Sequence, residues 1–215
     1  AQDLVRAIED VNPGKYEFYL SPRNANRGRA IIAEYSNFHQ LASNQEVVDQ
    51  SDLVFIGVLP TQVDEVLSAL NFRADQIIAS LAAGKAPSHV AKLVAPATKV
   101  AQLIPLPMIE FKKGPIVCCP KIPEISQLLQ GLGDVIEFDD ETIIPIFSTT
   151  SAIMSTDFTL VNHIIDWKHK QGVNFELSAK YVTSLLEALG TKANHIDPKT
   201  LKDQPVKHET PGGLN

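Results

Sequence analysis

The chain has 215 residues, of which 44% are hydrophobic and 20% are charged, and its formal net charge is −6. This length allows one large domain or two modest ones, and this composition is that of an ordinary soluble globular protein. The negative charge argues against a nucleic-acid binder, which needs a basic patch. No apolar run approaches the roughly 18 residues of a membrane span, and no signal peptide is visible, so we expect no membrane partner.

The two cysteines, Cys118 and Cys119, are adjacent in the sequence. Neighbouring cysteines are poor partners for one disulfide and do not make a zinc-ligand set. His163 and His169, with Asp166, fit the polar face of a helix better than a metal site, and the other histidines are scattered. We therefore expect no metal and a reducing compartment, the cytoplasm.

Strand and helix patterns alternate from the first residue to about residue 139. Strands are expected at 16–20, 38–41, 53–58, 76–81, 99–104, 115–119 and 134–138, and an antiparallel direction stays open for 115–119. Helices are expected at 1–11, 27–35, 44–50, 62–70, 88–94 and 122–132. This order predicts an α/β fold with a Rossmann-like sheet.

After Asp139 the strand signals end, and helical patterns follow at 141–170 and 176–189. Gly190 is the expected helix stop, and 191–209 is expected to be a loop. We place the domain boundary near Asp139 and Asp140, with a Rossmann-like domain over 1–139 and an all-helical domain over 140–215. The many apolar residues of the helical part lead us to expect a homodimer formed through these C-terminal helices.

Residues 51–84 carry the clearest signal in the chain. Two runs rich in β-branched residues each end in a turn, and an amphipathic segment of helix length lies between them, as in a βαβ unit with a buried parallel sheet. Ligands of such sheets bind at the carboxyl ends of the strands. Residues 57–62 and 82–85 are therefore expected to border a binding crevice.

A second group of polar residues follows the strand expected at 16–20: Ser21, Arg23, Asn24 and Arg27. In dinucleotide-binding folds an acidic residue at this position binds the free 2′-hydroxyl of NAD, whereas arginine accommodates the 2′-phosphate of NADP. No acidic residue occupies this strand end, and the planar guanidinium matches phosphate geometry. A solvated turn before a helix is the alternative, and in this context we favour NADP.

A G-x-G-x-x-G turn, which usually identifies such a site, is absent, because the chain starts in what should be the helix after it. We expect the first strand and its glycine turn to belong just before Ala1, and both ends of the natural protein to be missing.

Several motifs then match one family pattern, in which an acidic residue and an apolar strand precede A-V-K-P-Q and the next strand ends in S-x-A-A-G. The matching residues are Asp52, Val58, Pro60, Gln62, Ser80, Ala82, Ala83 and Gly84. Residues 210–213 (TPGG) are similar to the family motif S-P-G-G-x-T. With these matches spread over nearly its whole length, the chain resembles the pyrroline-5-carboxylate reductases.

The resemblance implies an NADPH-dependent oxidoreductase that transfers hydride to a small cyclic imine, such as 1-pyrroline-5-carboxylate, in proline biosynthesis or a related reaction. It implies hydroxyl groups of Ser151 and Thr210 as proton donors. It implies cofactor contacts from Ser21, Arg23, Asn24, Arg27, Val58, Leu59, Pro60, Gln62, Ala82, Ala83 and Gly84. Substrate contacts are implied for Thr149, Thr150, Gly212, Gly213 and Asn215.

The chain also departs from the family pattern. Leu59 stands where the family has the lysine of A-V-K-P, and residues 102–108 (QLIPLPM) lack the arginine and asparagine of R-x-M-P-N-T-P. The family motif G-S-G-P-A at the start of the helical domain is represented only loosely, by residues 149–152 (TTSA). Leu214 and Asn215 replace the threonine that follows Pro-Gly-Gly in the family. Because the last two changes fall in substrate motifs, they put the substrate in doubt more than the cofactor.

Two other classes of function stay open. A non-catalytic NADP-binding sensor would bind NADPH without turning over any imine or ketone. A β-hydroxyacid dehydrogenase would use a lysine in a K-x-x-x-N pattern, which Lys170 and Asn174 match across Gly172. Loss of β-hydroxyacid oxidation in a Lys170→Ala variant would support that class.

Overall fold

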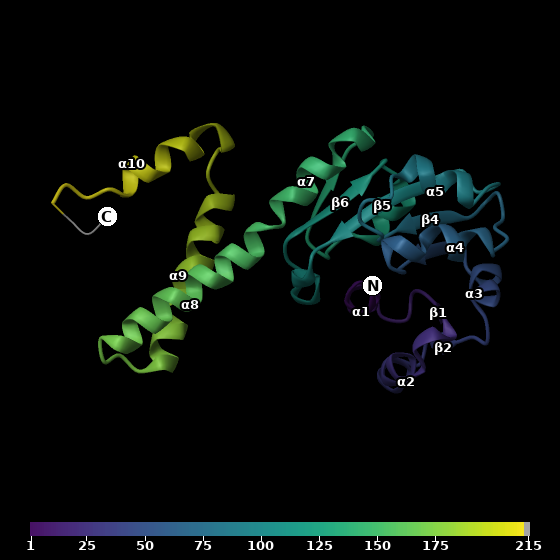
Figure 1. Cartoon of the computed structure of the whole chain (residues 1–215), viewed down its shortest axis with the longest axis horizontal. Helices are drawn as coiled ribbons and strands as arrows, with labels where there is room; N and C mark the ends of the chain where they lie inside the picture. Colours follow the sequence, from purple (N-terminus) through teal and green to yellow (C-terminus); the bar gives the residue numbers. More distant parts are fainter. Residues whose placement is uncertain (213–215) are drawn as a thin grey trace. The chain divides into compact units, whose positions relative to one another are not determined.

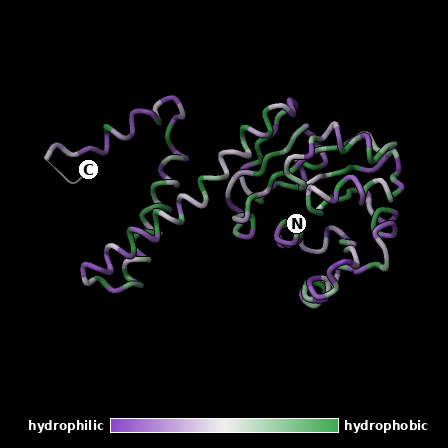
Figure 2. Tube along the Cα trace, viewed as in Figure 1, coloured by the Kyte–Doolittle hydropathy of each residue, from purple (hydrophilic) through white to green (hydrophobic). Residues whose placement is uncertain are grey.

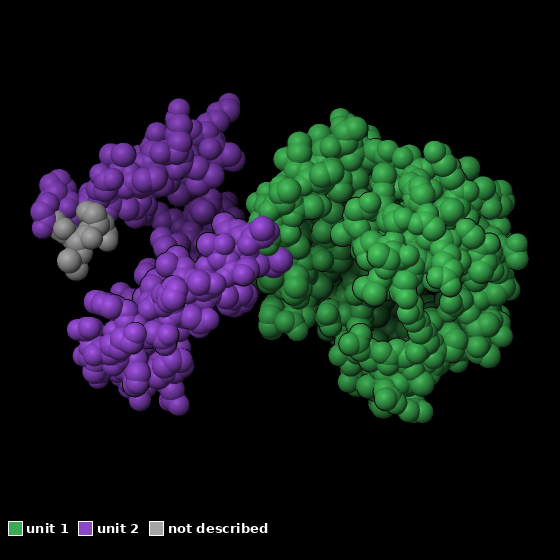
Figure 3. Space-filling model, viewed as in Figure 1, with its two compact units in different colours: residues 1–151 green, residues 152–215 purple. Residues whose placement is uncertain are grey.

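The computed structural model describes residues 1–212 of the chain. The chain folds into two compact units, residues 1–151 and residues 152–215, which Figure 3 shows in different colours. The first unit contains every strand of the described residues, and the second contains only helices. The α/β class with a Rossmann-like sheet and a helical C-terminal region is thereby confirmed.

Two sheets form the first unit (Figure 1). In the smaller one, β1 (Phe18–Leu20) pairs in parallel with β2 (Phe38–Gln40). The larger sheet has the order β3 (Leu53–Ile56), β4 (Ile77–Ser80), β5 (Lys99–Pro105), β6 (Pro115–Cys119) and β7 (Asp134–Glu137). Its ladders are parallel except that between β5 and β6, so the direction left open for 115–119 is antiparallel.

Strand β5 pairs with different neighbours along its two halves. Its first half pairs with β4 and its second half with β6, and Gln102 at the junction lies opposite Ser80 on one side and Cys119 on the other. Glu137 of β7 lies opposite Cys118. The carboxyl ends of β6 and β7 therefore lie level with the carboxyl end of β4, although β6 and β7 run in the opposite direction.

Alternate residues of the strands fill a hydrophobic cluster on each face of the larger sheet, as expected for strands whose side chains alternate between faces. On one face Ala79 packs with residues of α1 (Gln2–Val11) and α6 (Pro123–Leu128). On the other, Ile78 packs with α3 (Asn44–Gln50), α4 (Val63–Ser68) and α5 (Pro87–Leu93). Figure 2 shows hydrophobic residues along these strands, which are covered on both faces. The helix α2 (Ala25–Glu34) packs beside β2 of the smaller sheet. A side chain at Gly28 would meet that of Gln40 there.

The segment after β7 belongs to the first unit. It forms a short 3₁₀ turn, η4 (Glu141–Ile143), and the helix α7 (Ile144–Thr150). The Glu141 carboxylate accepts hydrogen bonds from the backbone N–H of Ser88, at 3.0 Å, and from its hydroxyl, at 2.5 Å. The Phe147 ring stacks on Phe138 with 5.2 Å between centroids. These contacts attach α7 to the sheet, so the chain divides after Ser151 rather than near Asp139.

The second unit begins with two long helices, α8 (Ile153–Lys170) and α9 (Phe175–Asn194). They pack through Val161, Ile165 and Val182. Gly172 adopts φ +89 in the turn between them, and Asn174 caps α9 through a 3.2 Å bond from the N–H of Leu177. A single helix over 141–170 was a wrong expectation, because this stretch is divided into η4, α7 and α8, and residues 151 and 152 belong to neither long helix.

Two further expectations for this unit were wrong. Gly190 does not end α9, which continues to Asn194. A glycine costs only about 1 kcal/mol relative to alanine inside a helix, and the neighbouring helix formers outweigh it. Residues 191–209 are not a loop, since they include η5 (Pro198–Asp203) and α10 (Gln204–His208). Their prolines begin these turns, where the missing N–H costs nothing.

Candidate functional site

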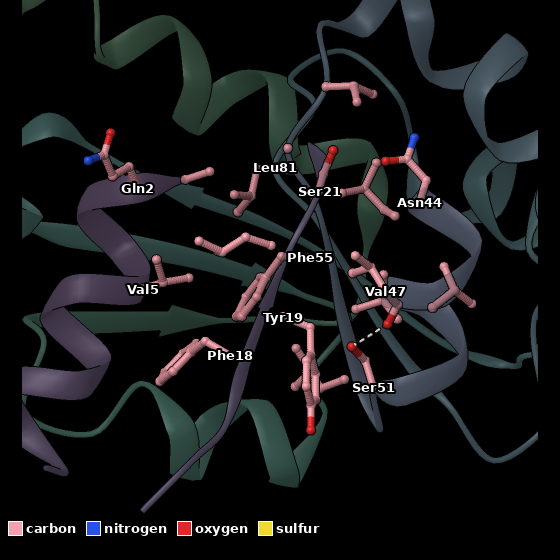
Figure 4. Close-up of a pocket in the computed structure, with 18 of the residues that line it drawn as sticks. Gln2, Val5, Phe18, Tyr19, Ser21, Asn44, Val47, Ser51, Phe55 and Leu81 are labelled. Carbon is pink, nitrogen blue, oxygen red and sulfur yellow. Dashed lines mark hydrogen bonds between the residues drawn. The ribbon is translucent and has the colours of Figure 1, made fainter. Parts of the chain in front are cut away.

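A cavity of about 1390 Å³ lies in the first unit between β1 and β3. Its body is apolar, with Phe18 and Tyr19 from β1, Phe55 from β3 and Val5 from α1 around it (Figure 4). The polar turns that follow β1 and β3 line one end of the cavity, and this end is called the mouth below. Pockets for drug-sized molecules usually hold about 300–1000 Å³, so this cavity has room for a ligand larger than these.

The residues assigned to the cofactor gather at this mouth. Nine of the eleven line the cavity: Ser21, Arg23, Asn24, Arg27, Val58, Leu59, Pro60, Gln62 and Ala83. The other two lie beside it in the same turn, where Ala82 is buried and Gly84 takes φ +78. Gly57, the first residue of the segment expected to border the crevice, lines the cavity as well. Leu20 also lines it, and no sequence pattern singled out this residue, because only its neighbours carry polar groups.

The turn after β1 is held by its own side chains. It forms a 3₁₀ turn, η1 (Pro22–Asn24), in which the Ser21 hydroxyl accepts a 3.3 Å hydrogen bond from the N–H of Arg23. Asn24 caps α2 by accepting a 3.2 Å bond from the N–H of Arg27. Polar residues with short side chains favour such turns because they replace the missing backbone partners. The two arginine side chains are thus carried on a defined backbone.

The turn after β3 lies within hydrogen-bonding reach of the turn after β1. It is also a 3₁₀ turn, η2 (Pro60–Gln62), and it leads into α4. The guanidinium of Arg23 donates a 2.9 Å hydrogen bond to the side-chain oxygen of Gln62, across 39 positions of the sequence. Leu59, in the same turn, is 64% exposed.

Charge is distributed unevenly along the cavity. Arg23 and Arg27 line its mouth. At the other end the lining includes Lys15 together with three acidic residues: Glu17 precedes β1, Asp52 precedes β3, and Glu124 pairs with Lys99 at the start of β5. The two arginines therefore favour an anionic group at the carboxyl ends of the strands.

A salt-bridge cluster lies beside the turn that follows β4. The Asp64 carboxylate, on α4, contacts Lys85 and the ring of His89. The hydrogen bond from Lys85 and then that from His89 hold the pKa of Asp64 below its usual value. Lys85 follows Gly84 directly, and its ammonium is engaged by Asp64.

The residues assigned to the substrate are distributed differently. At the end of α7 the Thr149 and Thr150 hydroxyls donate to the carbonyl of Ile146, at 2.8 Å and 3.4 Å. The Ser151 hydroxyl donates to the Ser148 carbonyl at 2.6 Å. These three residues do not line the cavity.

The second unit carries the other substrate and proton-donor candidates. Thr210 is exposed, and Gly212 takes φ +73. Gly213 and Asn215 lie outside the described residues.

The residues considered for other chemistry have structural roles or stand apart. Asn174 is the cap of α9, and Gly172 separates it from the helix that ends at Lys170. Within residues 1–212 no group of three or more histidine, cysteine, aspartate or glutamate side chains could hold a metal ion. Over the same residues no helix is long and apolar enough to cross a membrane.

Comparisons with known proteins give consistent results. A family model described as "NADP oxidoreductase coenzyme F420-dependent" matches residues 1–84. The pyrroline-5-carboxylate reductase of Corynebacterium melassecola is 24% identical over 213 residues, covering 93% of this chain and 78% of that protein.

Solved structures show the same fold. The 1-pyrroline-5-carboxylate reductase of Streptococcus pyogenes superposes with a TM-score of 0.80 at 19% identity, covering 99% of this chain and 83% of that one. The pyrroline carboxylate reductase of Plasmodium falciparum, solved with NADP bound, gives 0.79 at 18% identity, covering 100% and 83%. A reductive aminase of Aspergillus terreus, in complex with NADPH and ethyl levulinate, gives 0.67 at 16% identity, covering 94% and 75%.

Proposed function

We propose that the chain is a divergent relative of the pyrroline-5-carboxylate reductases, to one of which it is 24% identical, and that it is an NADPH-dependent reductase of a small cyclic imine. The observation that carries this proposal is the gathering of nine assigned cofactor residues around one mouth, two arginines among them. The substrate is 1-pyrroline-5-carboxylate, reduced to L-proline, or a related imine.

The cofactor is NADP, since the mouth fits a phosphate-bearing dinucleotide. The turn after β1 offers arginines and no carboxylate, and the acidic lining residues lie at the far end of the cavity. Arg23 and Arg27, with Ser21 and Asn24, hold the 2′-phosphate, and the turns at 58–62 and 82–84 hold the remainder. When bound, the cofactor supplies the hydride, and the protein supplies position and polarity.

The protein's part in the reaction is to hold the imine and provide one proton. The imine carbon gains hydride as its C=N double bond becomes single, and the nitrogen gains a proton from a hydroxyl of Ser151 or Thr210. In the structure the Ser151 hydroxyl donates to the Ser148 carbonyl, so it must give up this bond to protonate the imine nitrogen. Thr149, Thr150, Gly212, Gly213 and Asn215 hold the substrate in this proposal.

We also propose a homodimer formed through α8 and α9. Large apolar side chains remain exposed on these helices: Phe158 at 67%, Trp167 at 61% and Leu177 at 64%. Exposed apolar surface of this kind marks interaction sites, and a second copy offers the same surface. The cytoplasm is the proposed compartment, which the two buried free cysteines support.

One observation favours a second candidate, a non-catalytic NADP-binding sensor. Thr149, Thr150 and Ser151 all donate to carbonyls of their own helix, and Leu59 stands where the related reductases carry lysine. A chain with a preserved cofactor mouth and altered substrate motifs can bind NADPH and leave it unreacted.

Equilibrium binding and turnover distinguish these functions. NADPH and NADH are titrated by fluorescence, and NADPH oxidation is then followed with 1-pyrroline-5-carboxylate, other cyclic imines and ketones. We expect NADPH binding in preference to NADH and turnover on a cyclic imine. Binding without turnover supports the sensor, and binding of neither nucleotide refutes both functions.

A further inference from the structure

The reacting end of the proposed site lies at the turns that follow β3 and β4. Arg23 and Arg27 are assigned to the 2′-phosphate, so the turns at 58–62 and 82–84 are left for the part of the cofactor that supplies the hydride. An imine must approach that part to about 3–3.5 Å to react. The side chains of these two turns therefore meet the substrate and determine which substituents it can carry. The inference drawn from them rests on the proposed reductase function.

Leu59 presents an apolar side chain at this end. It lines the cavity and is 64% exposed. Its backbone is restricted by the following Pro60, and its carbonyl accepts a 2.8 Å hydrogen bond from the N–H of Gln62. Apolar groups of a ligand that cover this side chain gain free energy, whereas a carboxylate placed on it loses water without gaining a partner. Leu59 therefore favours an apolar substituent on the substrate.

Strand β5 contributes no positive charge to this end. Gln102 stands where the family pattern has arginine, and it is buried. Its side-chain N–H donates a 2.9 Å hydrogen bond to the carbonyl of Ala82, in the turn after β4. The bond holds that turn, but an uncharged amide does not attract a carboxylate as a guanidinium does. Residues 103–109, which complete β5 and lead into η3 (Pro107–Phe111), are also uncharged.

Lys85 is the one cation within residues 57–62 and 82–85, and it is already paired. Its ammonium contacts the Asp64 carboxylate, which also contacts the ring of His89. Binding a substrate carboxylate through Lys85 would bring a second anion beside Asp64, and like charges repel each other. These two turns therefore offer a substrate carboxylate no free positive charge.

The threonine hydroxyls assigned to the substrate do not replace this charge. A hydroxyl has one hydrogen to donate, and Thr149 and Thr150 both donate theirs to the carbonyl of Ile146. In these bonds the two hydroxyls present only lone pairs to a ligand. Lone pairs attract N–H groups and repel a carboxylate.

We infer that the imine reduced at this site carries no carboxylate and instead bears an apolar substituent, which packs against Leu59. The C=N carbon gains the hydride from NADPH, which leaves as NADP⁺, and the nitrogen gains a proton, so the product is a cyclic amine. The proposed function includes carboxylate-bearing and carboxylate-free imines, and the side chains at the reacting end narrow this class to the second kind.

The test compares 1-pyrroline-5-carboxylate with 5-methyl-1-pyrroline, in which a methyl group replaces the carboxylate. The ratio of their kcat/KM values is measured with NADPH for the wild type and for Leu59→Lys. A ratio taken within one protein does not depend on how much of that protein is folded. The charge-matched control is Phe111→Lys, since Phe111 is exposed on the first unit and does not line the cavity. Calorimetry in the presence of NADP compares the binding of the two products, L-proline and 2-methylpyrrolidine, without any reaction.

We expect the wild type to prefer 5-methyl-1-pyrroline by roughly tenfold or more, since an unpaired carboxylate forgoes the usual worth of a charged hydrogen bond. The wild type should also bind 2-methylpyrrolidine more tightly than L-proline. Leu59→Lys should shift the kcat/KM ratio toward the carboxylate by a similar factor, and Phe111→Lys should leave it unchanged.

The failures of the two proposals differ. A wild type that prefers 1-pyrroline-5-carboxylate overturns the inference and leaves the reductase function standing. An unchanged ratio in Leu59→Lys, or an equal shift in Phe111→Lys, also overturns the inference, because Leu59 then does not select the substrate. Turnover of neither imine by a protein that binds NADPH refutes the reductase function, and the inference with it.

Discussion

Arg23 and Gln62 join the turns that follow β1 and β3, through a 2.9 Å hydrogen bond from the guanidinium to the amide oxygen. The bond uses one of the five N–H donors of the arginine and leaves the others for a ligand. It also restricts a long side chain that would otherwise lose rotamer freedom on binding. Arg23 is therefore held at the mouth of the cavity before any phosphate arrives.

Replacing Arg23 should change nucleotide preference. A hydrogen bond to a charged group contributes about 1.5–3 kcal/mol, so Arg23→Ala should lower the ratio of NADPH to NADH affinity by roughly tenfold to a hundredfold. Gln62→Ala removes only the restraint on the guanidinium and should lower the ratio by a smaller factor. Both affinities are measured by fluorescence titration.

The matched control is Arg29→Ala. Arg29 bonds to Asn26 on α2 and does not line the cavity, so its loss should leave the ratio unchanged. An unchanged ratio in Arg23→Ala would show that this residue does not bind the 2′-phosphate.

The exposed apolar residues of α8 and α9 should control the oligomeric state. Placing a carboxylate in an apolar interface costs several kcal/mol, so Phe158→Asp together with Leu177→Asp should convert the proposed dimer to a monomer at micromolar concentration. The molar mass is measured by sedimentation equilibrium. Phe111→Asp is the control, since Phe111 is 68% exposed on the first unit and should leave the mass unchanged. A wild-type mass of one chain would exclude the dimer.

Glu141 should contribute stability that depends on pH. The two hydrogen bonds from Ser88 hold its pKa below the ordinary value of 4.5. The folded state therefore prefers the charged carboxylate, so this contribution is complete above the unfolded pKa and is lost as the pH falls through the folded pKa. Glu141→Gln should lower the free energy of unfolding by about 1 kcal/mol at neutral pH, the usual worth of a helix cap.

In acid the difference between Glu141→Gln and the wild type should shrink toward zero. Urea unfolding at a series of pH values measures it, with the exposed Glu65→Gln as a control that leaves stability unchanged. A difference that stays constant down to acid pH would show that the carboxylate charge is not involved.

Cys118 and Cys119 should be unreactive in the folded protein. Both side chains are buried, and burial is the main cause that raises the pKa of each thiol to about 11. Only the thiolate attacks alkylating reagents, so at about pH 8 iodoacetamide should label neither cysteine in buffer and both in urea. Mass spectrometry counts the labels, and rapid labelling without urea would contradict the burial.

Local patterns predicted most of the elements. The helix predicted at 44–50 has these bounds in the structure, where the Ser43 hydroxyl caps its start by accepting a hydrogen bond from the N–H of Glu46. The failures lie in the second unit, where proline and glycine were interpreted as breakers. Gly190 lies inside a helix, and Pro198 and Pro205 lie in the first turns of η5 and α10.

The sequence predicted individual residues of the candidate site, but it did not predict how these residues contact one another or the form of the cavity. Strand-end positions predicted residues that line one end of the cavity, because carboxyl ends of parallel strands converge. The Arg23–Gln62 bond joins positions 39 apart, and no local pattern reports such a pairing. The cavity likewise depends on how β1 and β3 face each other in space, and the periodicity of the sequence does not encode this arrangement.

The register of β5 fixes the distance along the sheet between its two sets of neighbouring strands in the first unit. Since Gln102 lies opposite both Ser80 and Cys119, the length of β5 sets how far β6, β7 and the following α7 lie along the sheet from the turn at 82–84. Inserting one residue into β5 would reverse which side chains face each cluster. Inserting two would preserve the faces and displace α7 by about 7 Å, at about 3.3 Å per residue. The distance between the mouth of the cavity and α7 can therefore change only through insertions or deletions of two residues in β5.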